Sequence, residues 1–278
     1  MVADCKLIFR RISQKGSRFM TRKMNKLLFT LAIIVMIGSS AALVHSLYGD
    51  FVYWRDARVA RHNAATMQEV FAELIESDEE FPPEDDTYSA FISPVIIARE
   101  ITGNADIVAY IHVDGTNISH AVLQGEDNEF YLYRDINRQP NVNGSIFLDY
   151  ANSPYFDDRN SIIYGHNMRN GEMFHNIRYF MNLDFFQENR YITIITEHEI
   201  LTYEIFSAFS TRVDFEYIQV DFYDDDDFLR LLSEVQRRCI HGTESLLGVD
   251  DRILILSTCT NVEQDTRIVV AAFLQTHE

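Results

Sequence analysis

A long run without a charged side chain, close to the N-terminus, most limits what this chain can fold into. Leu27–Tyr48 contains no Asp, Glu, Lys or Arg. A helix of that length spans about 30 Å, the thickness of the hydrocarbon core of a bilayer. Eight basic side chains and no acid lie within residues 6–26, and such a bias keeps that end in the cytoplasm. We therefore predict a basic cytoplasmic tail over residues 1–26, a transmembrane anchor over 27–48 and an extracellular remainder.

A cleaved signal peptide is the alternative interpretation of this segment. Small residues, Ser39 to Ala42, stand near its end, as they do before a cleavage site. The apolar region of a signal peptide usually covers about 7–15 residues, and this one is longer. Its length favours an uncleaved anchor with a single membrane crossing.

The charge of the chain is distributed unevenly. The formal net charge is −18, and residues 1–26 carry eight basic side chains against one acid, so the rest of the chain stands at −25. A surface this acidic repels nucleic acid, which we exclude as a partner, and it suits a cationic or amine-bearing one. Simple solubility would explain the same charge.

After the predicted anchor, the spacing of the apolar residues changes once, from a helical to a β-strand pattern. Residues 49–104 are predicted as a helical region and linker, because Met67, Val70 and Phe71 share a helical stripe and the acidic, proline-bearing segment 78–89 follows. From residue 105 onward, short β-rich runs are separated by turn-forming clusters, which indicates a mostly β barrel or sandwich.

One helix interrupts the β-rich pattern, over Asp221 to Cys239. Four consecutive aspartates stand at its start and two arginines at its end, as the helix dipole favours. A calcium loop would space its oxygen ligands on alternate residues around a glycine, so we interpret the aspartates as a helix start. No metal-ligand spacing occurs, and we predict neither a metal nor a cofactor.

The cysteines single out one thiol. Cys5 precedes the predicted anchor, and Cys239 follows Val235 at helical spacing, which predicts a core position. Cys259 ends the apolar run that begins at Ile253, where it would pack as a small hydrophobe unless a base or cation lies near it. His166 also ends an apolar run, before a glycine-flanked turn. Two neighbouring strands of a barrel could bring both side chains to one rim; an ordinary turn position is the alternative for His166.

Several ordered segments together resemble one family. The segments "GSIFLDYAN", "NSIIYGHNM", "ILILSTC" and the arginine that opens "RIVVAAFL" resemble the class B sortases, membrane-anchored cysteine transpeptidases of Gram-positive bacteria. The resemblance extends from about Ala105 to Leu274. Two family segments differ here: Ala109–Ile111 replaces Gly-Trp-Ile, and His120–Gln124 replaces Tyr-Pro-Val-Val-Gln. Neither lies in the catalytic motifs.

The resemblance implies a fold and a set of roles. It implies a closed eight-stranded β-barrel over residues 105–278, with N-terminal helices and a helix inserted before the cysteine strand. Cys259 would attack a sorting-signal peptide after a threonine and form an acyl-enzyme. His166 would exchange the proton, and Arg267 would hold the carbonyl oxygen. The acylated surface protein would pass to an amine of a peptidoglycan precursor or cross-bridge at the cell wall.

Five further positions match family residues that line the substrate pocket. Each has a simpler interpretation, because leucine and isoleucine also fill cores and asparagine also forms turns. Where related enzymes often carry a threonine, this chain has Val213, which removes one polar contact. The candidate substrate-binding residues are Asn128, Leu132, Tyr217, Ile218 and Ser257.

Two other functional classes compete with the transpeptidase. Papain-like peptidases place the cysteine before the histidine, whereas His166 precedes Cys259 here, and the Ser-His-Gly-Cys motif of L,D-transpeptidases is absent. A membrane-anchored, non-catalytic peptide-binding module on a sortase-like barrel would be expected to lose a catalytic residue type. All three types are present, which favours the enzyme.

Overall fold

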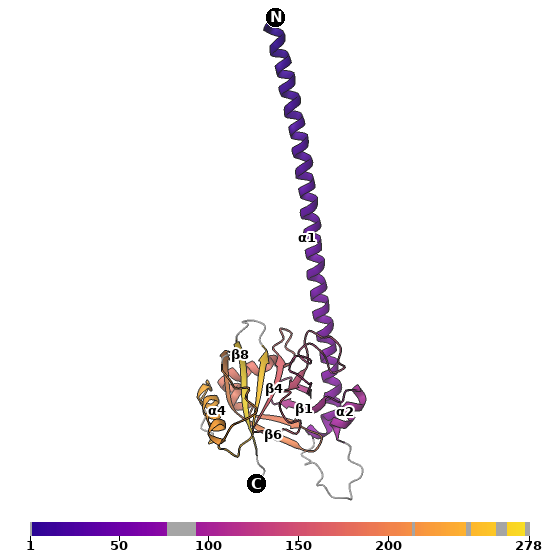
Figure 1. Ribbon diagram of the computed structural model, residues 1–278. Coiled ribbons are helices and arrows are strands. Elements are labelled where there is room, and N and C mark those ends of the chain that lie inside the picture. Colours follow the sequence, from indigo (N-terminus) through magenta and orange to yellow (C-terminus); the bar gives the residue numbers. More distant parts are fainter. Residues whose placement is uncertain (1, 77–92, 213–214, 243–245, 260–265, 276–278) are drawn as a thin grey trace. The chain divides into compact units, whose positions relative to one another are not determined.

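A computed structural model describes residues 2–76, 93–212, 215–242, 246–259 and 266–275 (Figure 1). The chain divides into two compact units, Met1–Trp54 and Arg55–Glu278. Helix α1, Val2–Glu76, contributes residues to both. Part of α1, within Met24–Ala72, is long and apolar enough to cross a membrane, and its apolar window is not buried in the protein.

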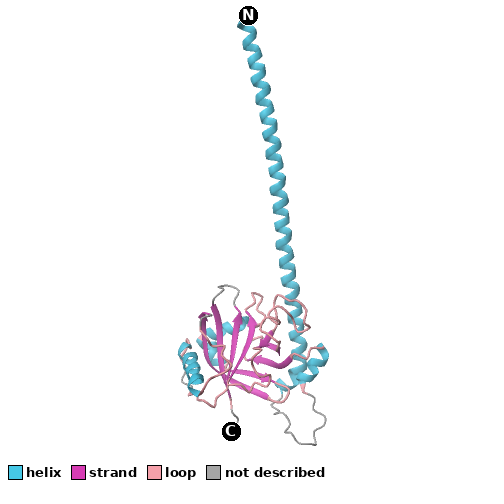
Figure 2. Ribbon diagram, in the orientation of Figure 1, coloured by secondary structure: helices cyan, strands magenta, loops and turns pink. Residues whose placement is uncertain are grey.

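Eight strands of the second unit close into a barrel, in the order β1-β2-β3-β4-β7-β8-β6-β5 (Figure 2). The closed, eight-stranded barrel that the family resemblance implies is therefore confirmed. The strands are β1 Ile107–Val113, β2 Ser119–Leu123, β3 Ile146–Leu148, β4 Asn160–His166, β5 Tyr191–Ile195, β6 Ile200–Arg212, β7 Ile253–Cys259 and β8 Thr266–Leu274. The other helices are α2 Pro94–Thr102, the 3-10 helix η1 Phe174–Met181, α3 Leu183–Glu188 and α4 Asp225–Arg238.

The N-terminal helices of this unit pack on the barrel, as predicted. Met67 and Phe71 of α1 and Val95 of α2 share one buried cluster with barrel residues. The ring of Phe71 stacks on that of Tyr110 in β1, with ring centroids 4.3 Å apart. Strands such as β2 are buried along their whole length, since their outer faces are covered. The predicted linker 78–89 lies outside the described residues.

Helix α4 lies between β6 and β7 in the chain and alongside the barrel (Figure 1). Asp224 caps it, since the Asp224 carboxylate accepts the backbone N–H of Asp227 at 2.9 Å. The aspartate run is thus a helix start, as the sequence indicates. The apolar face of α4 packs on β6 and shares one buried cluster with residues of β6, β7 and β8. Its buried residues are Phe228, Leu231, Leu232 and Val235.

The prediction that Cys239 belongs to the core is wrong. Helix α4 ends at Arg238, so Cys239 is the capping residue after the helix and is partly exposed. The helical spacing from Val235 does not carry to a position where the backbone has left the helix.

Candidate active site

The register of two parallel strands aligns the candidate base with the candidate nucleophile. β4 and β7 pair in parallel from Asn160 opposite Ile253 to His166 opposite Cys259. Both strands end at this pair, so the two residues occupy the same rim of the barrel. The side chain of Cys259 lies outside the described residues, whereas its backbone position in β7 is given by the pairing.

The third catalytic candidate, Arg267, is the second residue of the neighbouring strand β8. β7 and β8 pair antiparallel up to Ser257 opposite Val269. The hydroxyl of Thr258 then accepts the backbone N–H of Ile268 at 3.0 Å. One residue further along each strand stand Cys259 and Arg267. Arg267 is partly buried and pairs with Thr211 of β6 on its other side, so the three strand ends β4, β7 and β8 bring His166, Cys259 and Arg267 to one rim.

The His166 ring is held by a backbone oxygen. Its Nε2 lies 2.7 Å from the carbonyl oxygen of Leu132. A carbonyl can only accept, so Nε2 carries a proton and donates. Nδ1 is buried and has no hydrogen-bond partner among the described residues. Burial lowers the pKa of His166 below its usual value, against the Leu132 carbonyl, which favours the charged ring.

A glycine permits close packing directly before the histidine. A Cβ on Gly165 would lie 2.7 Å from the ring of Phe174, which is fully buried in η1. No real side chain tolerates that approach, so the aromatic ring of η1 sits against the β4 backbone only because residue 165 is glycine. This contact explains the glycine of the "YGH" motif in terms of packing.

Tyr164 of β4 and Ser257 of β7 form the floor of the candidate site, below the rim that carries His166 and Cys259. Tyr164 and Ser257 are Cα partners two residues before His166 and Cys259, so they lie on the same face. The hydroxyl of Tyr217 lies 2.8 Å from that of Ser257, and both side chains are buried. Two of the predicted substrate-binding residues are thus in direct contact. The next residue, Ile218, is 50% exposed.

On the other side of this floor, a buried carboxylate organises Asn128. Asp149 accepts the side-chain N–H of Asn128 at 2.9 Å and the hydroxyl of Tyr164 at 2.8 Å. Asn128 in turn accepts the backbone N–H of Tyr150 at 3.0 Å. These bonds fix the orientation of the Asn128 amide and leave one of its N–H hydrogens available as a donor.

The structure therefore brings most of the predicted site residues to one region of the barrel, and it shows further residues in contact with them. Leu132 contacts His166 through its backbone carbonyl, a role that no side-chain motif reveals. Asp149 and Tyr164 were missed as individual residues, although both stand inside segments that carry the family resemblance. The sequence does not single them out, because their importance comes from hydrogen bonds between segments that are distant in the chain.

Comparison with known proteins decides the family. The family model of the sortase domain matches residues 111–275, more than half of the chain. This chain belongs to the sortase family. Its sortase region is 36% identical over 165 residues to sortase B of Listeria monocytogenes, covering 58% of this chain and 65% of that protein. It is 34% identical over 171 residues to sortase B of Staphylococcus aureus, covering 61% of this chain and 70% of that protein.

The fold agrees with the same class. A solved sortase B–substrate complex from Staphylococcus aureus superposes with a TM-score of 0.68 at 28% identity, covering 81% of this chain and all of that one. The likeness to class B sortases, a class of cysteine transpeptidases, is thus confirmed in sequence and in fold. The sequence matches span about two thirds of the length of the curated relatives.

Proposed function

We propose that this protein is a class B cysteine transpeptidase, with Cys259 as nucleophile, His166 as proton carrier and Arg267 as the cationic group. The observation that carries the proposal is the parallel register that sets His166 opposite Cys259 at the ends of β4 and β7. Arg267 is the second residue of the adjacent strand β8. Family membership supports the same reaction class.

The reaction has two halves. The Cys259 thiolate attacks the carbonyl carbon of a threonine in the sorting signal, and His166 gives its proton to the departing amine, which leaves a thioester. An incoming amine then attacks the thioester, His166 takes back a proton, and the thiolate leaves. Arg267 cannot lose its charge, so it supplies fixed positive charge where the carbonyl oxygen becomes negative.

The surroundings of His166 suit this exchange. With Nε2 donating to the Leu132 carbonyl, Nδ1 is the nitrogen left to move the proton. The lowered pKa makes the neutral ring dominant near pH 7, so the productive pair of imidazolium and thiolate forms a minority of the resting enzyme. A minority suffices when the groups are already in place.

The floor and its two sides form the proposed peptide site. Asn128 offers one N–H donor on one side, and the exposed side chain of Ile218 offers apolar surface on the other. Leu132, Tyr217 and Ser257 complete the substrate-binding set. The similar sortase B of Staphylococcus aureus has been solved as a substrate complex, which supports substrate binding by a barrel of this kind.

We assign the donor, the acceptor and the location with the same proposal. The donor is a surface protein that bears a C-terminal sorting signal, and the acceptor is an amine of a peptidoglycan precursor or cross-bridge. The apolar part of α1 anchors the protein in the cell membrane, with the N-terminus cytoplasmic and the barrel extracellular. The acidic exterior favours approach of a cationic amine.

The deciding experiment uses the full chain in detergent with quenched NPQTN-like and PPxTG-like peptides, with and without a diaminopimelate-type amine. We expect cleavage after threonine, an amine-dependent ligation product and a thioester at Cys259 visible by mass spectrometry. Cys259→Ala should keep the far-UV circular dichroism spectrum of the unmodified protein and lose all turnover. Binding of peptide without any turnover by the unmodified protein would instead identify the non-catalytic peptide-binding module.

A further inference from the structure

The position of His166 depends on a turn remote from the strand that carries it. The Leu132 carbonyl, which accepts the His166 proton, sits against Gly144: a Cβ there would lie 2.5 Å from that oxygen. Gly144 has a φ of +58°, open to glycine at no steric cost. Hydrogen bonds from Asn141 and Ser145 to the carbonyls of Tyr133 and Tyr131, at 3.0 and 2.9 Å, lock the two segments together.

The turn over residues 141–144 is fixed in its own right by helix α1. The carboxylate of Asp56 accepts the backbone N–H of Val142 at 3.0 Å, and the Asp56 carbonyl accepts the side-chain N–H of Asn141 at 3.3 Å. Asp56 is only 3% exposed. Arg55 neutralises it at 2.6 Å. A buried, charge-assisted bond of this kind holds its partner firmly.

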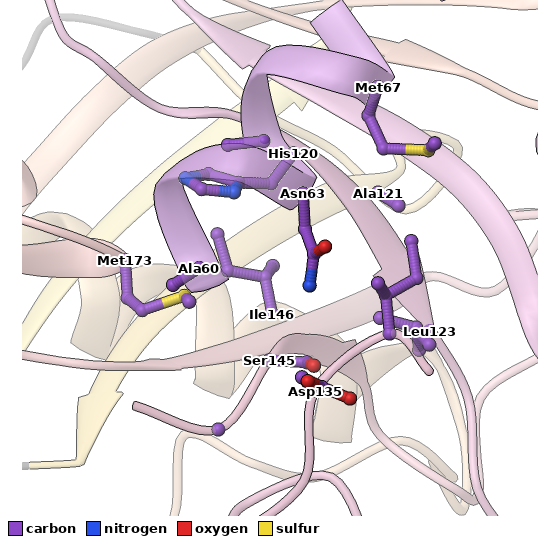
Figure 3. A pocket seen from close by; sticks show the side chains of 13 residues that line it. Ala60, Asn63, Met67, His120, Ala121, Leu123, Asp135, Ser145, Ile146 and Met173 are labelled. Carbon is purple, nitrogen blue, oxygen red and sulfur yellow. The ribbon is translucent and has the colours of Figure 1, made fainter. Parts of the chain in front are cut away.

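Close packing does not replace this bond. Next to the turn, a cavity of about 30 Å³ separates α1 from the barrel loops (Figure 3). Asn63 of α1 faces it from one side, and Ser145 and Asp135 line it on the other. Because a small, mostly apolar cavity separates α1 from the barrel loops at this level, the hydrogen bonds of Asp56 link α1 to the turn where close packing does not.

A second contact from α1 reaches the other side of His166. Arg61 pairs with Glu172 at 3.3 Å, and Glu172 stands in the loop that follows β4 and is 8% exposed. Helix α1 therefore touches both loops that flank the catalytic histidine. Asp56 makes the buried contact of the two, and Arg61 is half exposed.

We infer that Asp56 is a positioning residue for catalysis: through the turn 141–144 it fixes the Leu132 carbonyl, and thereby the His166 ring. Helix α1 is then a support of the active site in addition to whatever anchoring its first part provides. This inference rests on the proposed transpeptidase function. It predicts an effect on the chemical step, because Asp56 lies outside the proposed set of peptide-binding residues.

The test compares Asp56→Ala with Arg58→Ala in the full chain in detergent, since Arg58 is an exposed residue of the same helix. A misplacement of about 1 Å can cost about 10²-fold in rate. We expect Asp56→Ala to lower kcat by about tenfold or more with KM within about twofold, and Arg58→Ala to change neither. Asp56→Asn, which keeps an acceptor oxygen for Val142, should restore most of kcat. Equal kcat values for Asp56→Ala and Arg58→Ala would overturn the inference.

Two further experiments cover the cases in which Asp56→Ala does not fold or the unmodified protein cleaves no peptide. If Asp56→Ala does not fold, Asp56→Asn and Asp56→Glu decide: the asparagine keeps the geometry without the charge, and the glutamate keeps the charge but displaces the turn. A higher kcat for Asp56→Glu than for Asp56→Asn would contradict the positioning role of Asp56. If the unmodified protein cleaves no peptide, the proposed function fails, and alkylation of Cys259 in a Cys5→Ser, Cys239→Ser background becomes the readout. Asp56→Ala should then change that rate by about threefold or more, and an unchanged rate overturns the inference.

Discussion

At the scale of single residues, Arg267 distinguishes charge from geometry. A lysine in its place would keep the positive charge and a long apolar stem. It would lose the planar guanidinium, which can hold an oxygen with two parallel N–H donors. If Arg267 were only a charged residue at the start of β8, the two side chains would be interchangeable.

We expect Arg267→Lys to fold normally and to lower kcat/KM on the sorting peptide by about a hundredfold or more. Loss of one oxyanion-type donor typically costs about 10²–10³ in kcat, or roughly 3–4 kcal/mol. Steady-state kinetics give the value, and alkylation of Cys259 reports that the thiol still reacts. Arg159→Lys, which alters an exposed ion pair with Asp225, is the control. Near-normal peptide kinetics in Arg267→Lys would remove the oxyanion role and leave the family assignment untouched.

The residue scale also shows what sequence periodicity misses. Cys239 was placed in the core because it follows Val235 at helical spacing, but the helix ends one residue before it. We therefore expect Cys239→Ser to leave both activity and the free energy of unfolding almost unchanged. Chemical unfolding of the two proteins measures this, and a destabilisation above about 1 kcal/mol would show that the thiol is packed after all.

At the scale of elements, much of the architecture could be predicted and the contacts between elements could not. Apolar runs and turns placed the strands, and charge placed α4, because these are local properties of the sequence. That His166 and Cys259 share one rim was inferred only as a possibility of a barrel, and the structure adds the parallel register of β4 and β7, in which the two residues are Cα partners. The Leu132 carbonyl and Asp56 were invisible, since a backbone acceptor has no side-chain signature and a buried carboxylate looks like any surface acid.

Strand β2 carries a titratable group whose burial has a measurable consequence. His120 lines the cavity beside α1 (Figure 3), and burial lowers its pKa to about 4. The unfolded chain titrates this residue near 6.5. The unfolded state therefore binds the proton more readily, so the stability contributed by neutral His120 is present above about pH 6.5 and is lost as the pH falls toward 4.

We expect this residue to reduce the free energy of unfolding by roughly 3 kcal/mol between pH 7.5 and pH 4, since each pKa unit corresponds to about 1.36 kcal/mol. The measurement is chemical unfolding of the protein and of His120→Gln across that range. The glutamine variant does not titrate, so the difference between the two curves isolates His120 from the carboxylates, Asp135 among them. Parallel curves would show that His120 binds its proton equally well when folded.

At the scale of the whole molecule, the uncharged segment and the proposed site residues fall in different compact units. Leu27–Tyr48, the uncharged segment, lies entirely within Met1–Trp54, whereas every proposed catalytic and substrate-binding residue lies within Arg55–Glu278. Asp56 and Arg61 also belong to the second unit. A cut before Arg55 should thus separate membrane attachment from chemistry without removing the support of His166.

We therefore expect the intact protein in the membrane fraction, with its barrel open to protease added outside the cell. Deleting residues 1–49 should give a soluble protein whose kcat/KM stays within about twofold of the intact one, because the deletion removes the apolar segment and spares Asp56. Fractionation of cells, protease accessibility and peptide kinetics measure the three properties. A matched deletion of residues 1–60 tests the reason: it removes Asp56 but keeps Met67 and Phe71, which pack on the barrel. If both truncated proteins were equally active, α1 would matter for attachment alone, and release of a trimmed soluble form from intact cells would favour the signal-peptide interpretation.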